Sequence, residues 1–164
     1  MKKTLIAFLL ALTGTALAQY HGDYVDMGLP SGTQWKIINE SGLMTFDDAV
    51  QQYGNQMPTQ KQFEELIAYC ETEWTGRGIK FIGPNGKFII LQDAGKYDCN
   101  GNYENNYSVE YWSRTRYSDG SAYGIFYWYV NPNTPHDGGS RLVGINGMRG
   151  SSSRCNRRAI RLVR

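Results

Sequence analysis

The sequence SSSRCNRRAIRLVR, residues 151–164, carries five arginines. Whether this segment is disordered or folded decides which class of protein the chain belongs to. A disordered basic tail of this composition would bind nucleic acid, whereas a folded strand would belong to a domain. Ile160 and Leu162 point to one side of an extended chain and Arg161 to the other, which is the two-residue period of a strand. A disordered tail has no need of these apolar residues. The pattern therefore favours a strand that pairs into a sheet.

The opposite end of the chain has the layout of a secretory signal peptide. Two lysines precede an apolar run at residues 5–12, and the small-residue motif Ala-Leu-Ala follows at 16–18. The apolar run is too short to span a bilayer, and no cysteine follows the cleavage site to carry a lipid. We expect residues 1–18 to be removed and residues 19–164 to form one domain. The protein is then periplasmic or extracellular, with no stable membrane insertion and no nucleic-acid partner.

Charge is divided unevenly along the mature chain. Removal of the signal peptide leaves 15 of the 17 basic residues against 15 acidic ones. Residues 19–113 hold 13 acidic and 6 basic residues, whereas residues 114–164 hold 9 arginines and 2 aspartates. The two parts can attract each other within one domain, or the arginines can form a face for an anionic ligand. We favour the first interpretation.

Two segments have the signals of helices. In TFDDAVQQYG, residues 45–54, Thr45 can cap the first turn and Gly54 can end the helix. In PTQKQFEELIAYCETEW, residues 58–74, the capping pair is Thr59 and Gln62. Apolar residues then follow at three- and four-residue steps, which predicts one helical stripe. The stripe consists of Phe63, Leu66, Ile67, Cys70 and Trp74.

The hydrophobic period changes after the second predicted helix. GIKFIGPNGKFIIL, residues 78–91, contains two runs of strand-forming residues around Pro84-Asn85-Gly86, which predicts a hairpin. Two early helices followed by many strands predict an α+β fold with antiparallel sheet. Further strands are predicted at VEYWS (109–113), AYGIFYWYV (122–130), RLVGIN (141–146) and RRAIRLV (157–163).

Three cysteines, Cys70, Cys99 and Cys155, are the candidates for a disulfide. In an oxidising compartment the simplest arrangement is one disulfide and one free thiol, and the sequence leaves the pairing open. Cys70 lies on the apolar stripe, so it faces the core. Cys155 lies among three arginines, which predicts a lowered thiol pKa if it is free.

Five stretches resemble, in order, one family of exported bacterial proteins, the Fibrobacter succinogenes major paralogous domain and its Bacteroidetes relatives. They are YVDMGLPSGTQWK (24–36), QMPTQKQFEELIAYCETEW (56–74), GPNGKFIILQDAGKY (83–97), YWSRTRYSDGSAYGIFYWYV (111–130) and AIRLVR (159–164). The resemblance implies a C-type-lectin-like fold, with two helices in the N-terminal half packed on antiparallel sheets and a loop-rich C-terminal half. The formylglycine-generating enzyme and the variable proteins of diversity-generating retroelements share this scaffold, so the resemblance implies no particular reaction. Lys96, Asp98 and the arginine-rich end depart from the family pattern.

Signs of catalytic chemistry are few. His21 and His136 are the only histidines, and neither lies in zinc-site spacing or in a recognisable triad context. Neighbouring acidic residues, such as those at 47–48 and 64–65, lie at predicted helix starts or on outward helix faces, where acidic residues are common. We therefore expect no catalytic residue. The alternative is an enzyme related to the formylglycine-generating fold that uses Cys155.

Calcium is the one metal that the resemblance makes relevant, because C-type lectins bind sugars through it. The nearest match to a lectin calcium loop is NPNTPHDGG, residues 131–139, with Asn131, Asn133 and Asp137 as oxygen donors. Acidic residues are sparse in this stretch, so we expect no cofactor and keep calcium as the alternative.

Residues 111–156 combine tyrosine and tryptophan with arginine, asparagine, serine, aspartate and glycine, a mixture common in binding surfaces. This composition predicts a non-catalytic binding protein whose partner is a glycan or a cell-surface protein. The alternatives are a protein-binding adhesin or retroelement-diversified receptor, and a structural subunit of a surface assembly. The predicted ligand-binding residues are Tyr117, Trp128, Asn131, Asn133, Asp137, Arg141, Asn146, Arg149, Arg154 and Asn156.

Overall fold

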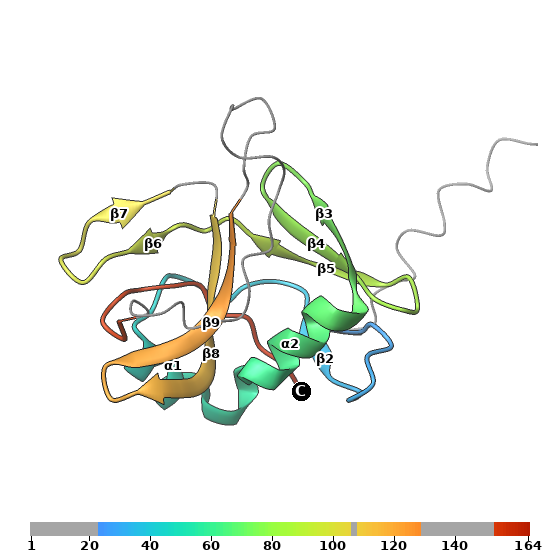
Figure 1. Cartoon of the computed structure of the whole chain (residues 1–164), viewed down its shortest axis with the longest axis horizontal. Helices are drawn as coiled ribbons and strands as arrows, with labels where there is room; N and C mark the ends of the chain where they lie inside the picture. The colour runs from blue at the N-terminus through green and yellow to red at the C-terminus, as the bar shows by residue number, and fades with distance from the viewer. Residues whose placement is uncertain (1–22, 106–107, 129–152) are drawn as a thin grey trace, which may run out of the picture.

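The computed structural model describes residues 23–105, 108–128 and 153–164. The predicted signal peptide and the strand predicted at 141–146 lie outside these residues. Within them the protein is α+β, as predicted, with two α-helices and several small antiparallel sheets (Figure 1). In chain order the elements are β1 (Tyr24–Asp26), β2 (Gln34–Lys36), α1 (Phe46–Tyr53), the 3-10 helix η1 (Gly54–Gln56), α2 (Gln60–Tyr69), β3 (Glu71–Trp74), β4 (Gly78–Ile82), β5 (Phe88–Gln92), β6 (Lys96–Tyr97), β7 (Tyr103–Glu104), β8 (Ser108–Ser118) and β9 (Ser121–Trp128).

Both helices begin as their capping signals predict, and α1 also ends where predicted. The Thr45 side chain accepts a hydrogen bond from the Asp48 amide at the start of α1, and Gly54 ends that helix. At the start of α2, Thr59 and Gln62 form the reciprocal capping box. Neither helix of the described residues is long and apolar enough to cross a bilayer.

The second helix is shorter than predicted. It ends at Tyr69, and residues 71–74 form β3. This strand pairs with β4 along its whole length, and Trp74 lies opposite Ile79. The prediction that the helical stripe runs to Trp74 was wrong, because pairing with β4 competes with helix continuation and Thr and Trp are strand formers. The hairpin predicted around residues 84–86 is confirmed by the pairing of β4 with β5.

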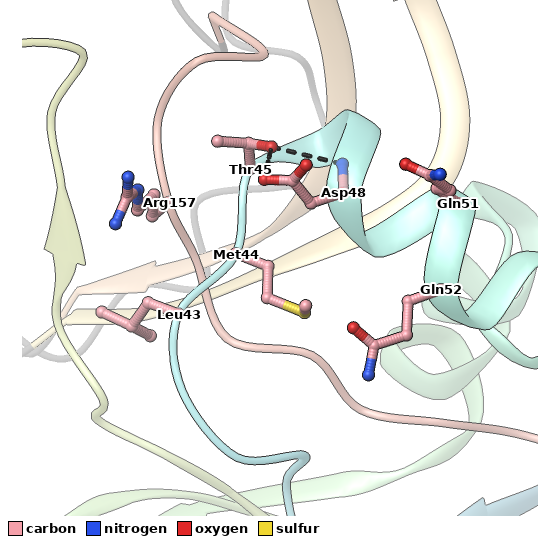
Figure 2. Close-up of a pocket in the computed structure, with 7 residues that line it drawn as sticks. All are labelled: Leu43, Met44, Thr45, Asp48, Gln51, Gln52 and Arg157. Atoms are coloured by element: carbon pink, nitrogen blue, oxygen red, sulfur yellow. Dashed lines mark hydrogen bonds between the residues drawn. The ribbon is translucent and has the colours of Figure 1, made fainter.

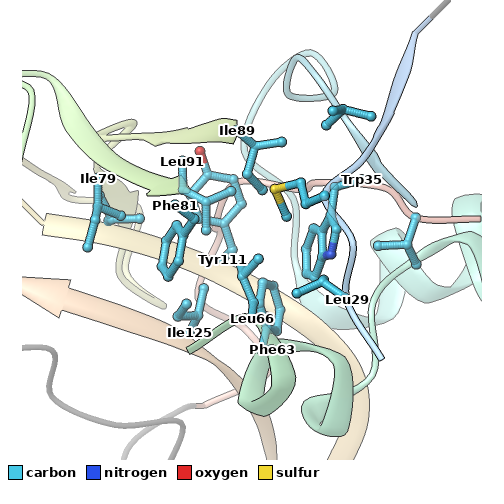
Figure 3. Packing of buried hydrophobic residues seen from close by; sticks show 14 of the residues in the cluster. Leu29, Trp35, Phe63, Leu66, Ile79, Phe81, Ile89, Leu91, Tyr111 and Ile125 are labelled. Carbon is cyan, nitrogen blue, oxygen red and sulfur yellow. The ribbon is translucent and has the colours of Figure 1, made fainter. Parts of the chain in front are cut away.

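The long β8–β9 hairpin contributes side chains to two hydrophobic clusters, and Figure 3 shows the larger one. Side chains alternate across β8, so Tyr111 belongs to one cluster and Trp112 to the other. The first cluster consists of Val25, Met27, Leu29, Trp35, Phe63, Leu66, Ile79, Phe81, Ile89, Leu91, Val109, Tyr111, Ile125, Ala159 and Val163. The second cluster consists of Phe46, Ala49, Met57, Trp112, Ala122, Ile160 and Leu162.

The C-terminal segment, residues 157–164, lies between the same two clusters. Ala159 and Val163 join the first cluster and Ile160 and Leu162 the second, so the predicted alternation is confirmed. The predicted strand is not continuous, however. The segment makes single bridges to Trp35, Met44, Tyr97 and Tyr111. These partners come from four separate parts of the chain, so no one strand runs along the segment.

Arg161 lies on the side opposite Ile160 and Leu162, and that side is core. Its side chain has 0% exposure and donates five hydrogen bonds, which is the full capacity of a guanidinium. The acceptors are the carbonyl oxygens of Lys36, Ile37 and Ile90 and the side-chain oxygen of Asn39. Burial lowers the pKa of Arg161.

Arg158 is buried on the other side of the segment. Its guanidinium carbon lies 4.3 Å from the ring centroids of both Trp112 and Phe126, and its Nε lies 3.1 Å from a carboxylate oxygen of the buried Glu110. Burial lowers the pKa of Arg158 to about 10, and the Glu110 carboxylate acts in the opposite direction. This pair joins an arginine of the basic part of the chain to a carboxylate of the acidic part. It agrees with the favoured interpretation of the charge division.

Candidate functional site

The β8–β9 hairpin leaves the core near its tip and presents an aromatic pair there. Side chains from Ser108 to Ser113 are buried, whereas Arg116 and Tyr117 are exposed. The pairing register shifts on both sides of Arg116, which breaks the regular alternation. Tyr117 is 53% exposed and packs edge-on against Tyr123, with ring centroids 5.2 Å apart. The predicted binding residue Tyr117 is therefore accessible and supported from one side.

Arg116, which precedes Tyr117 on β8, is also exposed. Among the described residues its side chain has no hydrogen bond or ion pair, and its position on β8 lies opposite Ala122. A free guanidinium suits hydroxyl-rich or anionic ligands. Arg116 was not among the predicted binding residues, although its neighbour Tyr117 was.

Arg154 holds the tip in place instead of standing free. Its backbone amide donates to the Gly120 carbonyl, and its guanidinium donates to the Asp119 carbonyl over 2.7 Å. The guanidinium also forms an ion pair with Asp47 at the start of α1. The predicted binding residue Arg154 thus connects the hairpin tip to α1 and is occupied by protein partners.

A disulfide joins Cys99 to Cys155, with the two Cα atoms 5.0 Å apart, and Cys70 is free. The prediction of one disulfide and one thiol is confirmed. The expected low pKa of Cys155 does not apply, because this sulfur is bonded and has no thiol to titrate. Burial, followed by the charge of Glu65, raises the pKa of the half-buried Cys70 from 9.0 to about 11.

The remaining predicted residues are placed only in part. Asn156 is partly buried, and its side-chain oxygen lies 3.2 Å from the sulfur of Cys99. Trp128 ends β9, where its backbone pairs with Ser108. The other predicted residues lie outside the described ones; they are Asn131, Asn133, Asp137, Arg141, Asn146 and Arg149.

A hollow of about 550 Å³ lies between α1 and the C-terminal segment (Figure 2). Met44 lies at its centre in Figure 2, with Leu43 and Arg157 on one side and Asp48 and Gln52 on the other. Thr45 and Gln51 complete the lining. Sequence reasoning missed this hollow and assigned the acidic residues of α1 only to helix capping. The one signal in the sequence is the polar outward face of α1, at positions 48, 51 and 52.

Metal ligands and acidic side chains can be placed in the part of the chain that the structure describes. That part holds no group of three or more histidine, cysteine, aspartate or glutamate side chains able to bind a metal. The oxygen donors predicted for calcium lie outside it. Two acidic residues considered from the sequence have structural partners, since Asp47 pairs with Arg154 and Glu65 accepts hydrogen bonds from Ser31.

Models of known protein families, curated proteins and solved structures were compared with this chain, and no match was found.

Proposed function

We propose that this is an exported, non-catalytic binding protein with a C-type-lectin-like fold, and that it recognises a glycan on a cell surface. The observation that carries the proposal is Tyr117, which is 53% exposed at the hairpin tip and is held edge-on by Tyr123. Sugars stack on such rings, and the neighbouring Arg116 can donate hydrogen bonds to sugar hydroxyls or to acidic substituents.

The scaffold beneath Tyr117 favours recognition because it is rigid. The base of the β8–β9 hairpin is packed between the two core clusters, and Arg154 attaches its tip to α1. A ring that is already fixed loses little conformational entropy when it binds a ligand.

The family resemblance supports the same proposal. Its stretch YWSRTRYSDGSAYGIFYWYV begins in β8 and covers the tip of the hairpin and the described part of β9. Both helices lie in the N-terminal half and the sheets are antiparallel, which is consistent with a C-type-lectin-like fold.

The test is a glycan array probed with the labelled mature protein, once with calcium and once with EDTA. We expect at least one glycan class to bind, and Tyr117→Ala to weaken that binding about tenfold or more. Tyr103→Ala is the matched control, since Tyr103 is 52% exposed and also packs against a second tyrosine, Tyr97. It should leave binding unchanged.

Two results would count against the proposal. An array with no signal above background in either buffer would contradict glycan binding. Equal binding by the Tyr117 and Tyr103 variants would show that the hairpin tip is not the binding site. Binding to intact cells that survives glycosidases and is lost after surface proteolysis would instead assign a protein partner.

A further inference from the structure

The hollow beside α1 has the two charges that a free α-amino acid requires. We propose that it binds such a zwitterion, with the ligand ammonium at Asp48, the ligand carboxylate at Arg157 and the ligand side chain on Leu43 and Met44. This site is separate from the hairpin tip, and its test is independent of glycan binding.

Asp48 and Arg157 both line the hollow and belong to different elements. Asp48 lies in the first turn of α1 and accepts one side-chain hydrogen bond, from the Thr45 hydroxyl over 2.7 Å. Arg157 belongs to the C-terminal segment, where its backbone pairs with Tyr97 and its side chain is exposed. In the described structure neither side chain forms an ion pair, with the other or with any third residue.

This lack of pairing distinguishes the hollow from the other side of the α1 start. There Asp47 is paired with Arg154, so a carboxylate and a guanidinium close directly on each other. At the hollow the two opposite charges are more than ion-pair distance apart and line a space of about 550 Å³. The proposed ligand carries both charges on one carbon and would contact both residues by charge-assisted hydrogen bonds.

The residues on the floor of the hollow favour an amino acid with an apolar side chain over a sugar. Leu43 and Met44 are partly buried and present aliphatic carbon and a thioether, which accept an apolar side chain. No aromatic residue belongs to the lining seen in the described structure, whereas sugar sites use a ring for stacking. The amides of Gln51 and Gln52 add polar contacts at the rim. The lining therefore fits an aliphatic amino acid better than a sugar.

The experiment is an NMR chemical-shift titration of the mature protein with four probes. L-leucine carries both charges, L-leucinamide lacks the carboxylate, N-acetyl-L-leucine lacks the ammonium, and methyl glucoside represents a sugar. We expect L-leucine to shift resonances at the hollow. Both leucine derivatives should bind about tenfold more weakly than L-leucine. Each derivative lacks one charged group, and the hydrogen bonds of that group contribute at least about 1.4 kcal/mol.

Two variants separate the two ends of the ligand. Arg157→Gln should weaken L-leucine about tenfold and leave L-leucinamide unchanged, whereas Asp48→Asn should weaken L-leucine equally and leave N-acetyl-L-leucine unchanged. The matched controls are Arg116→Gln and Asp119→Asn, which alter exposed charges outside the hollow and should have no effect on L-leucine.

Three results would each overturn the proposal. The first is that L-leucine causes no shifts at millimolar concentration, and the second is that both hollow variants bind L-leucine like the wild type. The third is that methyl glucoside binds at the hollow and L-leucine does not. Tyr117→Ala should leave L-leucine binding intact, so a failure of glycan recognition leaves this result unaffected. A thermal melt of each variant shows that a lost signal does not come from unfolding.

Discussion

Replacing Arg161 by leucine tests whether one buried guanidinium organises the centre of the fold. The side chain supplies donors to the carbonyl oxygens of the neighbouring Lys36 and Ile37 and of Ile90, which lies far from them in the sequence. Leucine retains apolar volume and removes every donor. The Asn39 oxygen keeps one donor, the hydroxyl of Tyr111 at 3.0 Å, so three carbonyls lose the guanidinium.

The expected loss of stability follows from those three carbonyls. A buried acceptor left without a donor costs about 1–3 kcal/mol, which gives about 3–9 kcal/mol for three of them. Leucine also removes the cost of burying a charge, and this offsets part of the loss. We expect the free energy of unfolding to fall by about 4 kcal/mol, a large share of the 5–15 kcal/mol that is ordinary for a domain.

Urea unfolding of the oxidised protein measures this loss directly. For an m-value of about 2 kcal/mol per molar urea, the midpoint of Arg161→Leu should fall by about 2 M. Arg161→Lys keeps the charge but not the planar fork, so it should also lose several kcal/mol. The matched control is Arg164→Leu, since the Arg164 side chain is exposed and makes one hydrogen bond, to Gln34, and one contact over the ring of Tyr24. It should cost less than about 1 kcal/mol.

The reasoning fails if Arg161→Leu and Arg164→Leu have the same midpoint. It also fails if lysine at position 161 restores wild-type stability, because the positive charge would then matter and the geometry of the donors would not.

Three further predictions concern the disulfide, a helix cap and the free thiol. Replacing both Cys99 and Cys155 by alanine should lower the free energy of unfolding by about 4 kcal/mol, because the bond closes a loop with a sequence separation of 56. Thr59→Ala should cost about 1 kcal/mol in the same urea assay, whereas Thr72→Ala on exposed β3 should cost less than about 0.5 kcal/mol. Cys70, with its pKa raised from 9.0 to about 11, should react with iodoacetamide at pH 8 more slowly than the same thiol in urea. Because the unfolded chain loses this proton first, Cys70 should also make stability fall as pH rises from 9 towards 11.

Each of these predictions can be contradicted by one result. The first is wrong if the disulfide variant keeps the wild-type midpoint in non-reducing buffer, while mass spectrometry confirms that the wild type carries the bond. The second is wrong if Thr59→Ala and Thr72→Ala have equal midpoints. The third is wrong if Cys70 is alkylated at the same rate in the folded and the unfolded chain.

Local signals in the sequence predict the local structure well. The caps at Thr45 and Thr59 and the hairpin at 84–86 depend on residues a few positions apart, so their chemistry is visible in a single stretch. The end of α2 was misplaced because Cys70 and Trp74 continue a helical spacing, and only the partner strand β4 decides between helix and strand.

The C-terminal segment shows the limit of such reasoning. Alternation of Ile160, Arg161 and Leu162 predicts an extended chain, and this is correct. Alternation alone does not show that the arginine side is buried, because burial depends on carbonyls that Lys36 and Ile90 bring from elsewhere.

The candidate sites were predicted to different degrees. The mixture of aromatic and polar residues in 111–156 pointed to Tyr117, and the structure shows that Tyr117 is exposed. The hollow needs Asp48 and Arg157 on neighbouring elements, and no short-range pattern joins residues so far apart in the sequence. A long sequence separation, of 56, also hides the partner of Cys155.

The position of residues 157–164 between both clusters has a consequence for the order in which the chain can fold. The first cluster takes Ala159 and Val163 from this segment, and the second takes Ile160 and Leu162, so neither closes without it. Helices and hairpins depend on local contacts and can form earlier, but the two clusters are complete only when the segment has joined them. A chain interrupted before residue 157 would therefore expose two apolar surfaces at once, and we expect proteases to degrade it rather than a smaller stable domain to survive.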